Sequence, residues 1–266
     1  TTSEFDSIIN VNKSLALSLG NQFIPAMSYT FTYDNAPLKK RHNLWWETSF
    51  TSAGNVTSLV YAAFGKGMKE KGKELLGSPF AQFLKMTSEI RCLFKEHIAT
   101  RLMGGVLYAY GNQTVAPYSE QFYIGGANSI RAFTVRSIGP GTFHPNADNR
   151  YGYIDETGDV KLEANIEYRF PILGDLYGAT FLDAGNVWLM KKDEARPGGE
   201  LTMRNFAKSV ALGTGVGLRY DLTFLVIRLD LGIALHAPYD TGKSGYYNIP
   251  KFKDGLGLHF AIGYPF

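Results

Sequence analysis

Period-two alternation is the feature that most limits what this chain can fold into. Residues 23–33 place Phe, Pro, Met and Tyr on one face and mostly Ala, Ser and Thr on the other. Residues 256–266 alternate large apolar side chains with Gly, His and Ala. This pattern predicts β-strands. We count about nine such stretches of about 10–14 residues, longer than the usual ~5–6 residues of soluble strands and typical of tilted strands that cross a membrane.

The residues opposite the apolar faces separate two architectures. A soluble sheet turns its apolar face to a core and its polar face to water. Here the less apolar faces mix charges with glycines, as in residues 160–170 and 210–220, and the apolar faces end in Tyr, Trp and Phe. The pattern favours an all-β fold, a transmembrane antiparallel β-barrel with aromatic girdles and a polar lumen. A soluble sheet protein is the alternative.

Composition narrows the functional classes. The 29 Gly, 18 Phe and 16 Tyr suit strands, turns and aromatic girdles. No stretch approaches the roughly 18 apolar residues of a membrane helix. The net charge of +3 does not by itself indicate nucleic-acid binding. The single cysteine, Cys92, excludes an intrachain disulfide framework and a cysteine-based metal site.

No signal-peptide pattern is visible at Thr1, so we expect a cytoplasmic chain or a trimmed mature product.

The connections between the expected strands alternate in length. The short ones are 35–42, 95–98, 171–175 and 221–222. The long ones are 54–78, 111–157, 190–207 and 236–254. Short turns on one rim and long loops on the other are typical of outer-membrane barrels, so we expect the C-terminus on the periplasmic rim.

Residues 55–77 interrupt the alternation. Helical spacing and a lysine cluster predict a helix within this connection; the lysines are Lys66, Lys69, Lys71 and Lys73. The lysines favour a solvated face, with contact to acidic lipid or to a partner as the alternative.

The longest connection contains an unusual segment, residues 122–141. It is rich in glycine, does not alternate, and holds Arg131 between apolar neighbours. Surface loops are usually small and polar. We therefore expect this segment to fold back and bury itself against the strands.

Sequence patterns for catalysis are weak. The five histidines lack metal-ligand spacing, and no Gly-x-Ser-x-Gly elbow occurs. His259 falls on an expected lumen face, but no serine can be paired with it, so we expect no enzyme and no cofactor. The run Gly213, Gly215, Gly217 has a period of two, which favours lumen-facing glycines that make room for the inserted loop over a phosphate-binding loop.

Three motifs, in this order, resemble the C-terminal part of barrels of the BamA/TamA superfamily, and most of all its TamA-like branch. FYIGGANSIRAFTVRSIGPG resembles the long sixth external loop of that family. GDVKLEANIEYRFPI, followed by YGATFLDAGNVW, resembles the two strands after that loop, and the terminal HFAIGYPF resembles the assembly signal. The resemblance covers roughly residues 21–266.

The resemblance implies that the tip of this loop is tucked into the lumen. The matching residues here are Gly125, Gly126, Ile130, Arg131, Ala132 and Phe133. Glu167 and Asp183 match the acidic positions on the two following strands, and alternation places Glu167 on the lumen face. Because an unpaired buried charge is costly, we predict that Arg131 pairs with one or both carboxylates and locks the loop inside. A solvated Arg131 is the alternative.

The resemblance also implies that the last strand is both an assembly signal and part of a gate. Its residues are Phe260, Ile262, Gly263, Tyr264 and Phe266. Gly263 falls at the family's kink glycine, where a glycine weakens strand pairing. The alternative is that position 263 is glycine only because a larger side chain would not fit in a crowded lumen.

Two features depart from the family pattern. Ala132 stands where the family usually has glycine, so this tip cannot rely on an easy positive φ there. The family barrel has sixteen strands preceded by POTRA domains, and about seven of those strands and all POTRA domains have no counterpart here. We therefore expect residues 1–266 to form the C-terminal part of one transmembrane barrel domain of a longer protein.

The function implied by the resemblance is that of an outer-membrane assembly factor that inserts client proteins through a lateral gate. The expected partners are outer-membrane lipid and lipopolysaccharide, client outer-membrane proteins, and periplasmic or inner-membrane assembly partners, with no nucleic acid. The expected location is the bacterial outer membrane. The alternatives are a two-partner-secretion translocator and a porin-like pore.

Overall fold

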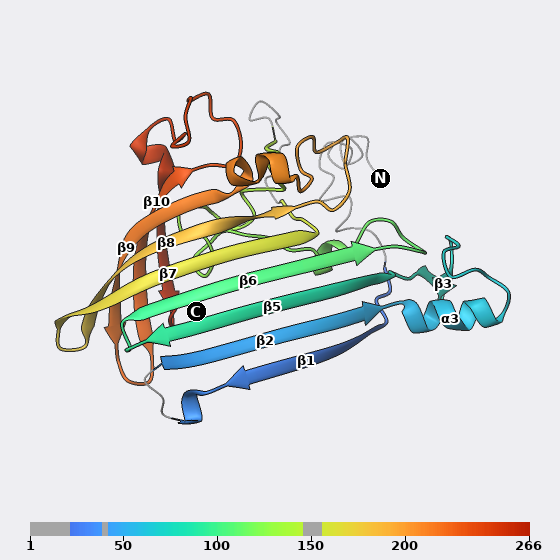
Figure 1. Ribbon diagram of the computed structural model, residues 1–266, viewed down its shortest axis with the longest axis horizontal. Helices are drawn as coiled ribbons and strands as arrows, with labels where there is room; N and C mark the ends of the chain where they lie inside the picture. Colours follow the sequence, from blue (N-terminus) through green and yellow to red (C-terminus); the bar gives the residue numbers. More distant parts are fainter. Residues whose placement is uncertain (1–21, 39–41, 146–155) are drawn as a thin grey trace.

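One curved antiparallel sheet dominates the computed structural model, which describes residues 22–38, 42–145 and 156–266 (Figure 1). Within these ranges nine strands pair in chain order, and β1 and β11 are the two edges. The strands are β1 (Ala26–Asp34), β2 (His42–Ala53), β5 (Phe83–Phe94), β6 (Ile98–Ala109), β7 (Val160–Leu173), β8 (Leu176–Trp188), β9 (Ala211–Asp221), β10 (Val226–His236) and β11 (Leu256–Ile262). The strand content predicted from alternation is confirmed.

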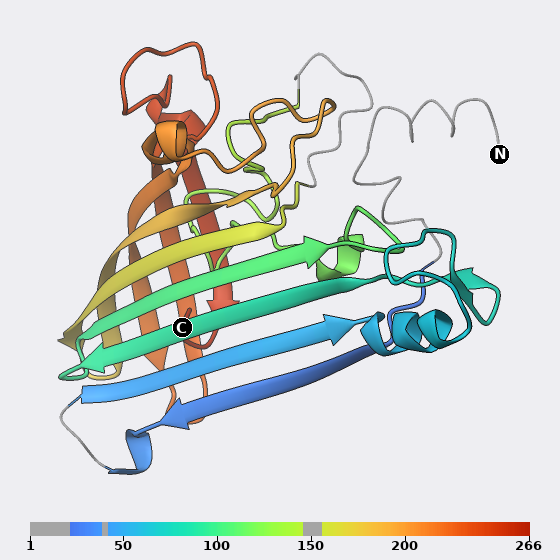
Figure 2. The same cartoon turned by 45° about the vertical axis from the view of Figure 1, so that its right-hand side comes forward.

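The connections follow the predicted asymmetry. Figures 1 and 2 show the short turns at one end of the strands and the long connections at the other. The long connections contain the small pair β3 (Glu74–Leu75) and β4 (Ser78–Pro79), the helix α3 (Asn55–Ala63) and the 3-10 turns η2 (Tyr118–Glu120), η3 (Met203–Ser209) and η4 (Phe252–Gly255). A further 3-10 turn, η1 (Ala36–Leu38), lies in the connection between β1 and β2.

The two faces of the sheet differ as an inside-out barrel requires. The outward row is apolar and exposed, for example Phe50 on β2, Leu218 on β9 and Phe260 on β11. The inward row over β7–β10 mixes charged residues and glycines with a few small or aromatic residues such as Ala179 and Phe181, and nearly all of its charged side chains are buried. No helix in the described part of the chain is long and apolar enough to cross a membrane.

The hydrophobic core is built around the long connection. Ile124, Ile130, Phe133 and Ile138 are buried together with small inward residues of the strands. Of the apolar residues in segment 122–141, Tyr123 and Val135 stay exposed. The expectation that this segment buries itself is therefore confirmed, and the apolar contacts lie inside the curve of the sheet.

Several predicted boundaries were wrong. Alternation extended the last strand to Phe266, but β11 ends at Ile262. The expected turn 171–175 is shorter, because β7 continues through Pro171 to Leu173. The predicted helix exists, but it ends at Ala63, before all four lysines.

Candidate functional site: an arginine-anchored loop inside the sheet

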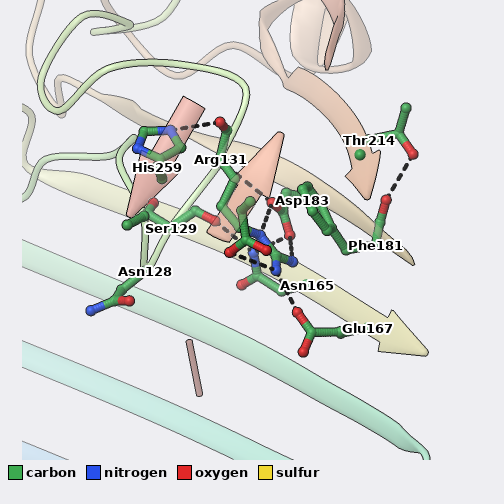
Figure 3. Close-up of polar contacts among 12 residues, drawn as sticks. Asn128, Ser129, Arg131, Asn165, Glu167, Phe181, Asp183, Thr214 and His259 are labelled. Carbon is green, nitrogen blue, oxygen red and sulfur yellow. Dashed lines mark hydrogen bonds and ion pairs between the residues drawn. The ribbon is translucent and has the colours of Figure 1, made fainter. Parts of the chain in front are cut away.

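Arg131 is completely buried, and two carboxylates from neighbouring strands hold it (Figure 3). Its Nε lies 2.9 Å from Oδ2 of Asp183, and its Nη2 lies 2.9 Å from Oδ1 of the same residue. Its backbone N–H also donates to Asp183 Oδ2, at 3.1 Å. Its Nη1 donates to Glu167 Oε2. Both predicted acidic partners are therefore in contact with Arg131, and the pair with Asp183 is bidentate.

The strand register explains why these groups meet. Asp183 on β8 pairs with Asn165 on β7, so the Asp183 and Glu167 side chains belong to adjacent positions of the same inward face. Arg131, on the long connection between β6 and β7, points to that face (Figure 3). Charge-assisted hydrogen bonds of this kind are about twice as strong as neutral ones.

The electrostatics keep the guanidinium charged. Burial alone would lower the pKa of Arg131, but the hydrogen bonds and negative charges of Asp183 and Glu167 outweigh burial and raise the pKa. The guanidinium also stacks on the ring of Phe181, 3.4 Å from the ring centroid. A face-on aromatic ring attracts a cation further.

A wider arginine cluster surrounds this pair. Arg219 on β9 bridges two carboxylates, with Nη2 2.9 Å from Glu167 Oε2 and Nη1 2.5 Å from Asp230 Oδ1. Arg169 on β7 donates from Nε to Glu167 Oε1 at 2.8 Å. We call Arg131, Glu167, Asp183, Arg219 and Asp230 the tip cluster. All five side chains are fully buried.

The main chain of the tip is also held. The carbonyl oxygen of Arg131 lies 2.8 Å from Nε2 of His259 on β11, so the last strand touches the tip directly (Figure 3). Gly232 on β10 lies beneath the same carbonyl, where an added Cβ would be 2.1 Å from the oxygen. Only glycine leaves room for the tip at that point.

Ala132 fits the tip without a glycine. It is not among the residues of positive φ in the described chain, so the departure from the family pattern causes no backbone strain. Its side chain packs over Gly213, where an added Cβ would lie 2.6 Å from that of Ala132. The prediction that Gly213 makes room for the inserted loop is confirmed. For Gly215 and Gly217 the same prediction is wrong. An added Cβ would meet the Leu231 carbonyl and the Phe181 ring at Gly215, and the Asp230 and Arg219 side chains at Gly217.

The base of the loop has contacts of its own. Gly125 and Gly126 both have positive φ, and Gly126 N–H donates to the Phe133 carbonyl at 2.8 Å, which closes the tip into a compact turn. Ser129 Oγ donates to Glu163 Oε2 at 2.8 Å. Arg228 on β10 donates to the carbonyl oxygen of Ala127 at 2.9 Å.

The C-terminal residues divide into two groups. Phe260 and Ile262 face outward and are exposed, as predicted. Gly263 has φ +86°, and a Cβ added there would meet nothing within 4 Å, so its conformation and not crowding requires glycine. Beyond it Tyr264 stacks on Arg169 and Phe266 on Arg101, with 4.1 and 5.5 Å from each guanidinium carbon to the ring centroid.

The outward position that alternation gave to Tyr264 and Phe266 is therefore wrong, because the chain turns at Gly263. The partners of both rings are inward-facing arginines of β7 and β6. Their aromatic faces stabilise these cations inside the sheet.

Sequence reasoning missed several members of the site. Period-two alternation places Arg219, Arg228 and Asp230 on the lumen face of the sheet but predicts no partner for any of them. The sequence signal for these residues is a charged side chain that shares its strand face with glycines, while the opposite face carries leucine and valine. His259 was considered as a catalytic group, whereas in the structure it contacts the loop backbone.

The curved antiparallel sheet, with its apolar outer face and a loop anchored on its inner face, has the features of a membrane β-barrel protein, although the described sheet is open between β1 and β11. A family model for the Omp85 superfamily domain matches residues 74–266. The chain belongs to the Omp85 superfamily.

Individual relatives agree with this assignment. The chain is 32% identical over 148 residues to sorting and assembly machinery component 50 homolog A of Xenopus laevis, a match that covers 54% of this chain and 30% of that protein. It is 32% identical over 90 residues to the outer membrane protein assembly factor BamA of Neisseria meningitidis serogroup B, which covers 32% of this chain and 11% of BamA. The chain thus spans less than a third of these relatives.

A solved structure supports the fold. BamA from Haemophilus ducreyi lacking POTRA domains 1-3 superposes with a TM-score of 0.53 at 15% sequence identity. The similarity covers 90% of this chain and 42% of that one. The barrel architecture is therefore that of BamA/TamA-type proteins.

Proposed function

We propose that this chain is the barrel portion of an outer-membrane factor that assembles or inserts other β-barrel proteins. The observation that carries the proposal is the loop tip held inside the sheet by Arg131, Glu167 and Asp183. Buried ion pairs fix this loop on the inner face of the sheet, so the interior is occupied and not left open as in a wide channel. An assembly factor needs a stable, filled interior while an edge of its sheet engages a client.

We further propose that the client pairs with a sheet edge at a lateral gate. β11 is short, with seven residues, and it is an edge of the described sheet. Gly263 ends its pairing by turning the chain inward. Main-chain hydrogen bonds offered by such an edge capture an extended segment by β-augmentation.

The remaining parts of the proposal concern the surroundings of the protein. We place it in the bacterial outer membrane, in the TamA-like branch, with client outer-membrane proteins, lipid including lipopolysaccharide, and periplasmic or inner-membrane assembly proteins as partners. The proposed role needs neither catalytic chemistry nor a cofactor, because strand pairing and local distortion of the bilayer do the work.

The alternative is a transport pore, either a two-partner-secretion translocator or a porin-like channel. Single-channel conductance of the full-length protein in planar bilayers separates the two. We expect a mostly closed channel with the loop in place, and larger openings in Arg131→Ala. A large, steady conductance in the unmodified protein contradicts the proposal.

A direct assay follows the insertion of a client barrel into vesicles that contain the full-length protein. We expect faster insertion than in empty vesicles, and loss of that acceleration in Arg131→Ala. Arg136→Ala is the matched control from the same loop, since the Arg136 guanidinium stacks on Tyr118 and Tyr123 instead of entering the tip cluster. Equal behaviour of the two variants contradicts a role for the anchored tip.

A further inference from the structure

The helix α3 carries an apolar face that no described residue covers. Val56, Leu59 and Val60 are 60%, 58% and 53% exposed, and Phe64, at the helix end, is 83% exposed. Residues spaced by three, four and eight positions lie on one side of a helix. Four large apolar side chains on one side of a short helix are not expected of a surface that faces only water.

The opposite face fixes the helix against the segment that leads into β5. Ser58 is buried and donates to Gln82 Oε1 at 2.9 Å. The ring of Tyr61 stacks on Phe80 at 6.2 Å between centroids. The outward direction of the apolar face is therefore a fixed property of the fold.

The apolar face continues the surface that faces lipid. α3 begins at Asn55, directly after β2, and lies beyond the end of that strand at the rim of the long connections (Figures 1 and 2). The outward residues near that end of the sheet, Phe50 on β2 and Met27 on β1, are exposed and apolar. A membrane-spanning sheet places this rim at the boundary between hydrocarbon and headgroups.

Charged residues follow the helix at the same rim. Lys66, Lys69 and Lys71 are exposed, as are Glu70 and Glu74, which leaves a small excess of positive charge. Glu70 is engaged by the Gly67 N–H at 3.0 Å. Lys73 differs from the other lysines: it is buried, and its Nζ donates to the carbonyl oxygens of Gly67 and Met68. The prediction of a solvated face is wrong for this lysine.

We propose that α3 is an interfacial anchor, whose apolar face lies in the headgroup boundary of the outer leaflet while Lys66, Lys69 and Lys71 contact anionic headgroups. Amphipathic helices with basic flanks bind membrane surfaces in this way. The anchor depends on the orientation of the barrel in the bilayer and not on the insertion of clients. It fixes the depth of the β2 rim, next to the edge strand β1.

Spin-label accessibility tests the anchor in the full-length protein. In a Cys92→Ser background, a nitroxide is attached at Val60→Cys, and its collision rates with oxygen and with a water-soluble nickel chelate are measured in vesicles containing phosphatidylglycerol. We expect the Val60 label to collide more often with oxygen than with the nickel chelate, and its depth in the bilayer to be shallower than that of a label at Phe50→Cys. Ser244→Cys, exposed on another long connection, is the water-facing control.

Each outcome bears on the proposal. A Val60 label that collides with nickel as readily as the Ser244 label overturns the anchor, and so does a label shielded from both reagents, because protein would then cover the helix. The Phe50 label reports separately whether the barrel is oriented as described. Replacing phosphatidylglycerol by a zwitterionic lipid is expected to move the Val60 label toward water, and an unchanged depth overturns the role of the lysines.

Discussion

The polar side chains on the inner face of the sheet find their partners in different ways on β1–β2 and on β7–β10. On β1 and β2 the inward face carries hydroxyls that pair across the strands, Ser28 with Thr51 at 2.8 Å and Thr30 with Ser49 at 2.5 Å; Ser28 and Thr30 are exposed, and their partners are half-buried. On β7–β10 the inward face carries arginines and carboxylates, among them Arg219, Glu167 and Asp230, whose side chains are fully buried beneath the inserted loop.

The comparison shows how covering the inner face with the loop changes the interactions of the polar side chains there. An exposed hydroxyl that loses its partner can bind water instead, so each pair contributes little to stability. Water cannot replace a lost partner of a buried charge, so every arginine in the tip cluster requires its carboxylate. The alternation is the same at both ends, but only the loop-covered end has interactions that depend on one another.

The largest effect is expected from Arg131→Ala. The substitution leaves Glu167 and Asp183 buried without this cation, which is expected to cost about 3–5 kcal/mol. Urea unfolding in micelles, followed by tryptophan fluorescence, measures the loss. Arg136→Ala, which removes the ring contacts with Tyr118 and Tyr123 but leaves the tip cluster intact, is expected to lose less stability than Arg131→Ala. Similar losses in both variants would remove the distinction between a buried anchor and a loop surface.

A smaller loss is expected from Asp183→Asn. The amide keeps the shape but loses the charge and one acceptor for the bidentate arginine, so we expect about 1.5–3 kcal/mol. The same unfolding assay measures it. Asp240→Asn, on a long connection outside the tip cluster, is the matched control. An Asp183→Asn protein as stable as this control would show that the carboxylate charge is not needed.

Gly232→Ala tests the close approach of the tip to β10. The added methyl group would lie 2.1 Å from the Arg131 carbonyl oxygen, so the tip must shift, at a cost of about 1–3 kcal/mol. Gly104→Ala on β6 is the control, since its added Cβ would meet only the Lys161 carbonyl at 3.9 Å. The comparison fails if both alanines are tolerated equally.

The smallest effect is expected at the hydroxyl pairs. Thr30→Val removes one hydroxyl but keeps the β-branched shape, and because the site is exposed we expect a change within about 0.5 kcal/mol. A loss comparable to that of Asp183→Asn would mean that the two ends of the sheet are stabilised alike.

Much of the fold followed from the sequence, because period-two alternation fixes which face a residue takes. The pairing of Arg131 with Glu167 and Asp183 was also accessible, since a buried cation needs anions and the resemblance supplied the positions. Alternation could not show that the chain turns at Gly263, because Tyr264 and Phe266 continue the apolar pattern. It also could not assign Arg219 to Glu167 or His259 to the Arg131 carbonyl, because these contacts join segments far apart in the chain.

A double-mutant cycle on Arg131 and Asp183 tests the central claim most directly. The unfolding free energies of Arg131→Ala, Asp183→Ala and the double variant are compared with that of the unmodified protein. If the loop is anchored through this pair, the double variant loses less than the sum of the single ones, with a coupling of about 1.5–3 kcal/mol. Losses that add to within about 0.5 kcal/mol would contradict the anchor.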